Sequence, residues 1–170
     1  DEIKNQHSLS TVSPEEAQDK APPLFVRRSI DMKKNLYIHI PFCRRKCLYC
    51  DFYSIGYESG LSREYIDIIV KQIDRLDGRF STIYIGGGTP SALEPALLER
   101  LLKALKPKLG GAARTEFTIE ANPESLDAAK AGIMSGYGVN RLSIGLQSLD
   151  DRKLKRLGRL HNAGRARETV

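Results

Sequence analysis

From Leu36 onward, the sequence alternates short runs typical of strands with longer amphipathic runs typical of helices. We predict strands over residues 36–42, 82–85, 117–121 and 141–146. Helices are predicted between them, over about 65–76 after a cap at Ser62, over 95–105 after Pro95, and over about 126–134. Asp150 is expected to cap a last helix that Gly158 ends. This order of elements is the pattern of parallel βα units.

Three of the predicted strands alternate apolar with polar side chains, whereas parallel strands buried on both faces normally read as continuous apolar runs. A purely structural sheet would avoid such a polar face, because buried polar groups need partners. We therefore predict a partial (β/α) barrel of the TIM type, with about four βα units and a ligand inside. The polar residues are Tyr37, His39, Thr118, Glu120, Arg141, Ser143 and Gln147.

The polar and unusual segments follow the ends of these strands. The cysteines follow the first strand, Gly86–Thr89 the second, Glu120 ends the third and Gln147 follows the fourth. In (β/α) barrels the carboxyl ends of the strands form the rim on which active sites are built. The sequence therefore predicts one site at this rim.

All three cysteines, Cys43, Cys47 and Cys50, fall within eight residues. An odd number of closely spaced cysteines argues against a disulfide framework and indicates metal or redox chemistry. Three thiolates in one loop can hold three irons of a [4Fe–4S] cluster, which leaves the fourth iron open to a small molecule. A thioredoxin-like Cys47–Cys50 pair and a Cys₃His zinc site that uses His39 remain as alternatives.

The other candidates each have an ordinary structural interpretation. The glycines of Gly86–Thr89 would let backbone amides approach a carboxylate or ammonium group, or would simply form a tight turn. Glu120 is the strongest candidate, since a carboxylate at a strand end that faces a barrel interior is rarely idle. Gln147 can cap a turn, and Arg159 lies in a basic stretch in which most arginines solvate a surface.

The net charge of +6 is concentrated after residue 31, and seven bases lie between Arg152 and Arg167. No aromatic interleaving or recognition motif accompanies them, so we favour a solvated helix face over nucleic-acid binding, with an anionic small molecule as the alternative. No run reaches the roughly 18 apolar residues of a membrane helix. No secretory signal is evident either, so we expect a cytoplasmic protein.

Residues 1–31 are polar and aperiodic, and we expect them to be a flexible extension or an expression remnant. Residues 32–170 then form the domain proper.

Read together, five segments resemble the radical SAM superfamily, in its branch of oxygen-independent coproporphyrinogen III oxidase-like proteins. SAM is S-adenosylmethionine. The resemblance covers about residues 36–161 and is specific because all five segments occur in order. They are Tyr37-Ile-His-Ile-Pro-Phe-Cys43 through Cys50-Asp-Phe-Tyr-Ser54, Gly86-Gly-Gly-Thr-Pro-Ser91, Glu120-Ala-Asn-Pro-Glu124, Asn140-Arg-Leu-Ser-Ile-Gly-Leu-Gln-Ser148 and Leu157-Gly-Arg-Leu-His161.

The resemblance implies a [4Fe–4S] cluster on Cys43, Cys47 and Cys50, with the amine and carboxylate of SAM on the open iron. It implies SAM contacts from Tyr37, Tyr49, Gly87, Gly88, Thr89, Glu120, Gln147 and Arg159. Electron transfer into the cluster would cleave SAM, a reaction that belongs to the cofactor while the protein positions it. The resemblance also implies that residues 32–170 are the N-terminal part of the core domain, without the remaining barrel units and the C-terminal domain.

One position departs from the porphyrinogen-decarboxylating members, which carry a further cysteine two residues after the third. Phe52 stands there, so the oxidative decarboxylase activity is in doubt. The sequences Asp-Phe-Tyr-Ser after Cys50, Gln-Ser-Leu from Gln147 and Leu-Gly-Arg-Leu-His from Leu157 resemble those of the heme chaperones of the HemW type. Such proteins bind heme and pass it to acceptor proteins. A heme or porphyrin, an acceptor protein and an electron donor are the partners implied. The coproporphyrinogen III oxidase and a zinc-stabilised binding domain are the alternatives.

Overall fold

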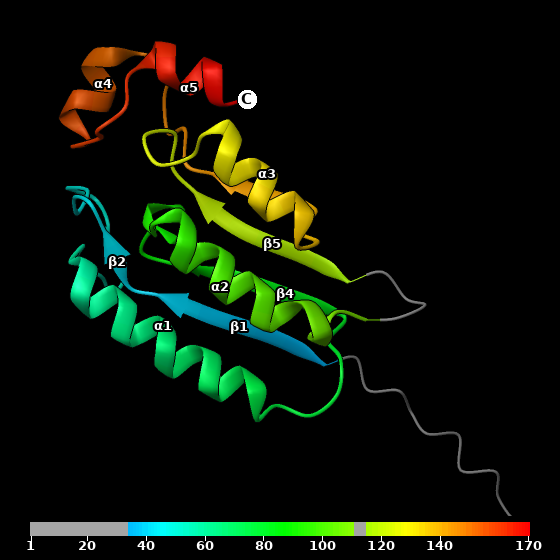
Figure 1. Ribbon diagram of the computed structural model, residues 1–170. Coiled ribbons are helices and arrows are strands. Elements are labelled where there is room, and N and C mark those ends of the chain that lie inside the picture. Colours follow the sequence, from blue (N-terminus) through cyan, green and yellow to red (C-terminus); the bar gives the residue numbers. More distant parts are fainter. Residues whose placement is uncertain (1–33, 111–114) are drawn as a thin grey trace, which may run out of the picture. The chain divides into compact units, whose positions relative to one another are not determined.

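The computed structural model describes residues 34–110 and 115–170 (Figure 1). The extension predicted over residues 1–31 lies outside this part of the chain. The elements follow in the order β1 (Asn35–Ile40), β2 (Phe42–Cys43), β3 (Ile55–Gly56), α1 (Ser59–Asp74), β4 (Thr82–Gly87), η1 (Pro90–Ala92), α2 (Pro95–Leu105), η2 (Lys106–Lys108), β5 (Glu116–Ala121), α3 (Ala128–Gly136), β6 (Arg141–Ile144), α4 (Asp151–Arg156) and α5 (Ala163–Thr169).

The main sheet has four parallel strands in the order β1-β4-β5-β6, so each strand lies next to the one that follows it in the βα rhythm. Helices α1, α2 and α3 cover one face of this sheet (Figure 1). The predicted parallel βα units are confirmed. Among the described residues β6 pairs only with β5 and forms one edge of the sheet, where Leu142 remains 37% exposed.

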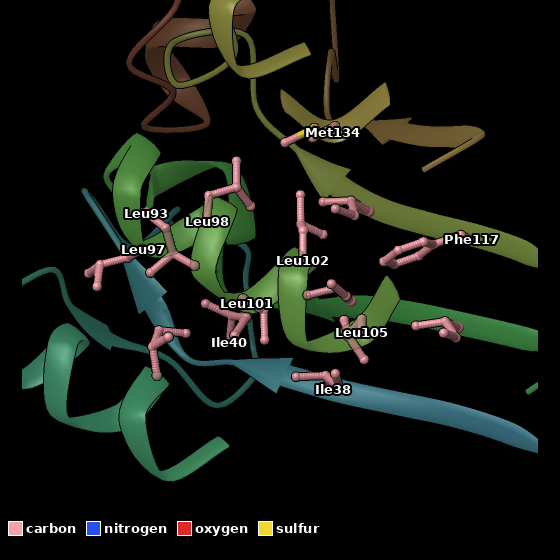
Figure 2. Packing of buried hydrophobic residues seen from close by; sticks show 14 of the residues in the cluster. Ile38, Ile40, Leu93, Leu97, Leu98, Leu101, Leu102, Leu105, Phe117 and Met134 are labelled. Atoms are coloured by element: carbon pink, nitrogen blue, oxygen red, sulfur yellow. The ribbon is translucent and has the colours of Figure 1, made fainter. Parts of the chain in front are cut away.

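The core lies between this sheet and the helices, with α2 at its centre (Figure 2). Pro95 occupies the first turn of α2, where its missing N–H costs nothing, and a short 3₁₀ turn containing Pro107 follows the helix. The helical spacing of the α2 leucines puts them all on the face that packs against the strands. They are Leu97, Leu98, Leu101, Leu102 and Leu105, all buried.

The beginning of α1 differs from the prediction. The N-cap is Glu58, whose carboxylate accepts hydrogen bonds from the amides of Gly60 and Leu61 at 2.7 and 2.6 Å. Ser62, the predicted cap, is fully buried within the helix and its hydroxyl donates to the Ser59 carbonyl. The cap prediction was wrong because Glu also places its carboxylate over the first turn, although it is a less usual cap.

Other boundaries moved by a few residues. The first predicted strand divides at Pro41, because proline cannot donate a hydrogen bond to a strand ladder, and β2 pairs with β3 instead. Strand β6 ends at Ile144 rather than Leu146. Asp150 caps α4 as predicted, and Gly158 follows it with a φ of 75°.

The basic stretch is only partly a solvated face. The Arg152 side chain on α4 is 93% exposed, as predicted, whereas that of Arg159 is 5% exposed. Helix α5 was not predicted; Asn162 caps it, and Arg165 donates to the carbonyls of Pro123 and Leu126. No helix in residues 34–110 or 115–170 is long and apolar enough to cross a membrane.

Candidate functional site

A cavity of about 470 Å³ lies at the carboxyl ends of the main-sheet strands, within the size range of small-molecule cofactor sites. The residues that the resemblance implies as cluster ligands and SAM contacts all line this cavity: Tyr37, Cys43, Cys47, Tyr49, Cys50, Gly87, Gly88, Thr89, Glu120, Gln147 and Arg159. These residues come from five segments that are distant in the sequence. The predicted rim site is therefore present as one surface.

The cysteine loop forms one wall of the cavity. Cys43 ends β2, and the amide of Cys50 donates to the carbonyl of Cys47 in a tight turn. All three cysteines are free and half-buried. The Cys43 Sγ lies 3.5 Å from the hydroxyl of Thr89, and the Cys47 Sγ accepts a hydrogen bond from Nη1 of Arg159 at 3.4 Å. Two of the thiols are thus oriented by residues from other segments.

The two alternative interpretations of the cysteines find little support. His39 uses both ring nitrogens inside the protein, with Nδ1 3.1 Å from the hydroxyl of Tyr37 and Nε2 3.1 Å from the carbonyl of Tyr53. It is therefore not available as a zinc ligand. The segment after Cys50 is irregular, without the helix that follows a thioredoxin-type pair.

The glycine loop owes its glycines to contacts within the protein. Gly87 has a φ of 114°, and a Cβ there would lie 2.7 Å from ring atoms of His39. A Cβ on Gly88 would lie 2.8 Å from the Phe42 carbonyl oxygen, which is backbone and cannot move aside cheaply. These contacts favour the structural interpretation, in which the glycines serve a tight turn. They let the loop pack against the β1–β2 junction, to which the amides of Gly88 and Thr89 donate at 2.8 Å.

Glu120 is held in a fixed orientation at the end of β5. Its Oε1 accepts the hydroxyl hydrogen bond of Tyr84 at 2.6 Å, and its Oε2 accepts from the Gly87 amide at 3.1 Å. The hydrogen bond to this carboxylate, together with burial, raises the pKa of Tyr84 above its ordinary value. The Tyr84 ring stacks on Tyr37, with centroids 6.1 Å apart. A carboxylate fixed in this way can accept further hydrogen bonds from a cationic ligand.

Arg159 connects three walls of the cavity. Besides Cys47, its guanidinium donates to Oδ1 of Asn122 at 2.6 Å and to the Gly145 carbonyl at 2.7 Å. Its Nε is buried and has no hydrogen-bond partner within residues 34–110 and 115–170. The basic stretch concealed this role, because composition does not distinguish a solvated arginine from an inward one.

Sequence reasoning did not single out Asn122 and Ser54. Asn122 lies two residues after Glu120, on the same side of the chain, and its Nδ2 donates to the hydroxyl of Thr89 at 3.1 Å. The two-residue strand period could have revealed it. Ser54 lines the cavity, and its buried Oγ has no hydrogen-bond partner in the described part of the chain. Nothing in the local pattern distinguished this serine.

The remaining candidates lie at the mouth of the cavity. Tyr37 is 57% exposed and Tyr49 is 49% exposed, and the hydroxyl of Tyr49 accepts from Arg159 at 3.5 Å. Gln147 is exposed and has a φ of 61°, the only positive value for a non-glycine residue in the described chain. Side chains at a mouth can close over a ligand that the deeper residues hold.

The residues present fit an iron–sulfur cluster with an amino-acid ligand beside it. Three free thiols share one wall, which suits a cluster held through three of its irons. The same cavity also contains a fixed carboxylate at Glu120 and a guanidinium at Arg159, which are complementary to an ammonium and a carboxylate. Arg159 and Ser54 both line this cavity, and each has one buried polar atom without a hydrogen-bond partner among the described residues.

Comparisons with known proteins find relatives over most of the described chain. The family model of the Radical SAM superfamily matches residues 37–170. The chain is 40% identical over 157 residues to "Heme chaperone HemW" of Escherichia coli K12. This match covers 89% of the present chain and 39% of the relative. The chain is 39% identical over 147 residues to mouse "Radical S-adenosyl methionine domain-containing protein 1, mitochondrial", covering 84% of this chain and 33% of that protein.

Among solved structures, the chain is similar to the radical SAM enzyme coproporphyrinogen III oxidase (HemN) from Escherichia coli. The TM-score is 0.67 at 28% identity, over 79% of this chain and 34% of that one. The likeness confirms the fold as part of a radical SAM barrel of the TIM type. The chain spans roughly two fifths or less of the length of these relatives.

Proposed function

Because the chain belongs to the radical SAM superfamily, in the HemW-type branch, we propose that Cys43, Cys47 and Cys50 hold a [4Fe–4S] cluster and that SAM binds beside it. One observation carries this proposal: the residues expected to hold these two groups line a single cavity. When bound, the cluster supplies the electron that cleaves SAM.

The contacts of the cavity residues support distinct tasks. Gly87, Gly88, Thr89 and Glu120 would bind the amino-acid part of SAM, since Glu120 is already oriented by Tyr84 and by a backbone amide. Arg159 would pair with the carboxylate of SAM through its planar fork. Tyr37, Tyr49 and Gln147 would contact the exposed remainder from the mouth of the cavity.

We further propose that heme is the cargo, delivered to an acceptor protein that is still unidentified, and that an electron donor reduces the cluster. Relatives from Escherichia coli and Haemophilus influenzae carry the name heme chaperone HemW, which supports this. Phe52 also supports it, because a phenyl ring cannot replace the thiol found two residues after the third cysteine in decarboxylating members. We propose a cytoplasmic location, which cell fractionation would test.

Coproporphyrinogen III oxidase is the second candidate, since the solved structure to which the chain is similar bears that name. Anaerobic incubation of the protein with coproporphyrinogen III, SAM and a reductant separates the two. We expect no protoporphyrinogen, together with a saturable heme titration by absorbance. Sustained turnover of the porphyrinogen would put the oxidase first.

Anaerobic reconstitution with iron and sulfide tests the cluster. We expect about four irons and four sulfides per chain, as in a [4Fe–4S] centre. Replacement of any one cysteine by Ala should abolish stable assembly, whereas Ser135→Ala on the exposed side of α3 should leave it intact. A triple cysteine variant that still binds stoichiometric iron and sulfide would refute the assignment, as would zinc as the only bound metal.

Binding of SAM to the reconstituted protein tests the second half of the proposal. Glu120→Gln should weaken binding by about 1.5–3 kcal/mol, the contribution of a charged hydrogen bond. Glu116→Gln is the matched control, because Glu116 begins the same strand, away from the cavity, where it pairs with Arg141. Equal SAM affinity in both variants would contradict the placement of SAM at Glu120.

A further inference from the structure

Two ionisable side chains that are not among the cavity's lining residues, the partly buried Glu124 and the buried His161, contact each other. Glu124 lies in the turn after β5, and His161 lies between α4 and α5. The side chain of His161 is 0% exposed and that of Glu124 is 17% exposed. Nδ1 of His161 lies 3.2 Å from Oε2 of Glu124.

The other ring nitrogen of His161 contacts the segment that follows β6. Its Nε2 lies 3.1 Å from the carbonyl oxygen of Leu146. A carbonyl only accepts, so Nε2 carries a proton and donates it. The Glu124 carboxylate lies within hydrogen-bonding distance of the other ring nitrogen, Nδ1. His161 therefore ties the turn after β5 to the turn after β6.

At one end of the His161 link Glu124 lies near the cavity residue Arg159, and at the other end Leu146 precedes the cavity residue Gln147. Oε2 of Glu124 is 4.0 Å from Nη2 of Arg159, the one ion pair that the described chain gives this buried guanidinium. A buried guanidinium without an opposing charge is costly, so the carboxylate favours its present location. At the other end, Leu146 immediately precedes Gln147, whose φ of 61° needs support from its surroundings.

We propose that Glu124 and His161 are positioning residues: they hold the Arg159 guanidinium against Cys47 and Asn122, and they hold the turn that presents Gln147. The placement of Arg159 is independent of any ligand. Its consequence for SAM rests on the proposed function, in which Arg159 and Gln147 contact SAM.

The position of Arg159 is tested first without any cofactor. In apoprotein labelled with ¹⁵N-arginine, the Arg159 guanidinium should give a resolved signal protected from solvent exchange, identified by its loss in Arg159→Lys. Glu124→Gln and His161→Gln should each raise its exchange rate by about tenfold or more, the scale of one lost charged hydrogen bond. Glu116→Gln, which neutralises the carboxylate of an exposed pair with Arg141, should leave it unchanged. Unchanged exchange in both test variants would overturn the proposal.

The effect on SAM is tested by a double-mutant cycle in the reconstituted protein. Glu124→Gln should weaken SAM binding by about tenfold, or 1.4 kcal/mol, in the native background. In the Arg159→Lys background it should add less than about twofold, because the residue through which it acts has changed. A merely structural role would weaken binding equally in both backgrounds, and that result would refute positioning through Arg159.

Two further outcomes are kept apart by this design. Absence of SAM binding in the unaltered reconstituted protein would contradict the proposed function, and the exchange experiment would still decide where Arg159 is held. If Glu124→Gln fails to fold, His161→Gln carries both experiments, since its amide retains a donor for the Leu146 carbonyl while the link to Glu124 is lost.

Discussion

Replacement of Gly87 by alanine examines why the loop after β4 contains glycine. The residue has a φ of 114°, a backbone conformation that costs an L-residue about 1–3 kcal/mol. The new Cβ would also lie 2.7 Å from ring atoms of His39, closer than real contacts allow, so the ring must move. Moving it disrupts its hydrogen bonds to Tyr37 and Tyr53, each worth about 0.5–1.5 kcal/mol.

We therefore expect Gly87→Ala to lower the free energy of unfolding by about 2–6 kcal/mol, a large part of a typical net stability of about 5–15 kcal/mol. Urea unfolding of the apoprotein, followed by far-ultraviolet circular dichroism, measures this. The matched control is Gly132→Ala in α3, where a Cβ meets nothing within 4 Å. That change should stabilise the protein by about 0.5–1 kcal/mol through helix propensity.

A His39→Ala background separates the two contributions. With the ring removed, the steric part of the Gly87→Ala cost should vanish, while the part due to the positive φ should remain. A Gly87→Ala protein within about 1 kcal/mol of the native stability would refute the reasoning. An equal cost in both backgrounds would refute the role given to His39.

Three other perturbations follow from the contacts of the described residues. Arg165→Met should cost about 1–3 kcal/mol in urea unfolding, since it leaves two carbonyls of the turn after β5 without donors; the exposed Arg167→Met should change little. Hydrogen bonds from the amides of Leu61 and Gly60 lower the pKa of the Glu58 carboxyl. The stabilisation of the protein by this ionised cap should therefore be present at neutral pH and lost as the pH falls through the lowered pKa. Glu58→Ala should flatten this acid limb of the stability profile. The pKa of Tyr84 is raised, so the stabilisation from its hydrogen bond to Glu120 should be fully present below the ordinary tyrosine pKa and lost as the pH rises through the raised pKa. Tyr84→Phe should remove the tyrosinate absorbance that appears at this higher pH.

The parallel βα order and many of the cavity residues were predictable from the sequence, although Asn122 and Ser54 were not. Hydrophobic period reports which side of an element is buried, and the period-2 alternation of β1 and β5 correctly indicated a polar face that contains Tyr37 and Glu120. The positions that follow strand ends then came together because parallel strands share one carboxyl edge. The close spacing of the three cysteines indicated metal or redox chemistry without any tertiary information.

What only the tertiary structure decided are contacts between residues distant along the chain. Local pattern described Arg159 as one base among several, yet it is buried against Cys47 and Asn122. It gave no sign that Glu124 and His161 meet. It left the glycines open between ligand approach and a tight turn, and did not reveal that His39 fills the space beside Gly87. Hydrophobic periodicity indicates which positions of an element are buried. The partner of a buried polar group depends instead on how two elements distant in the sequence pack together, and the sequence of neither element alone reveals that packing.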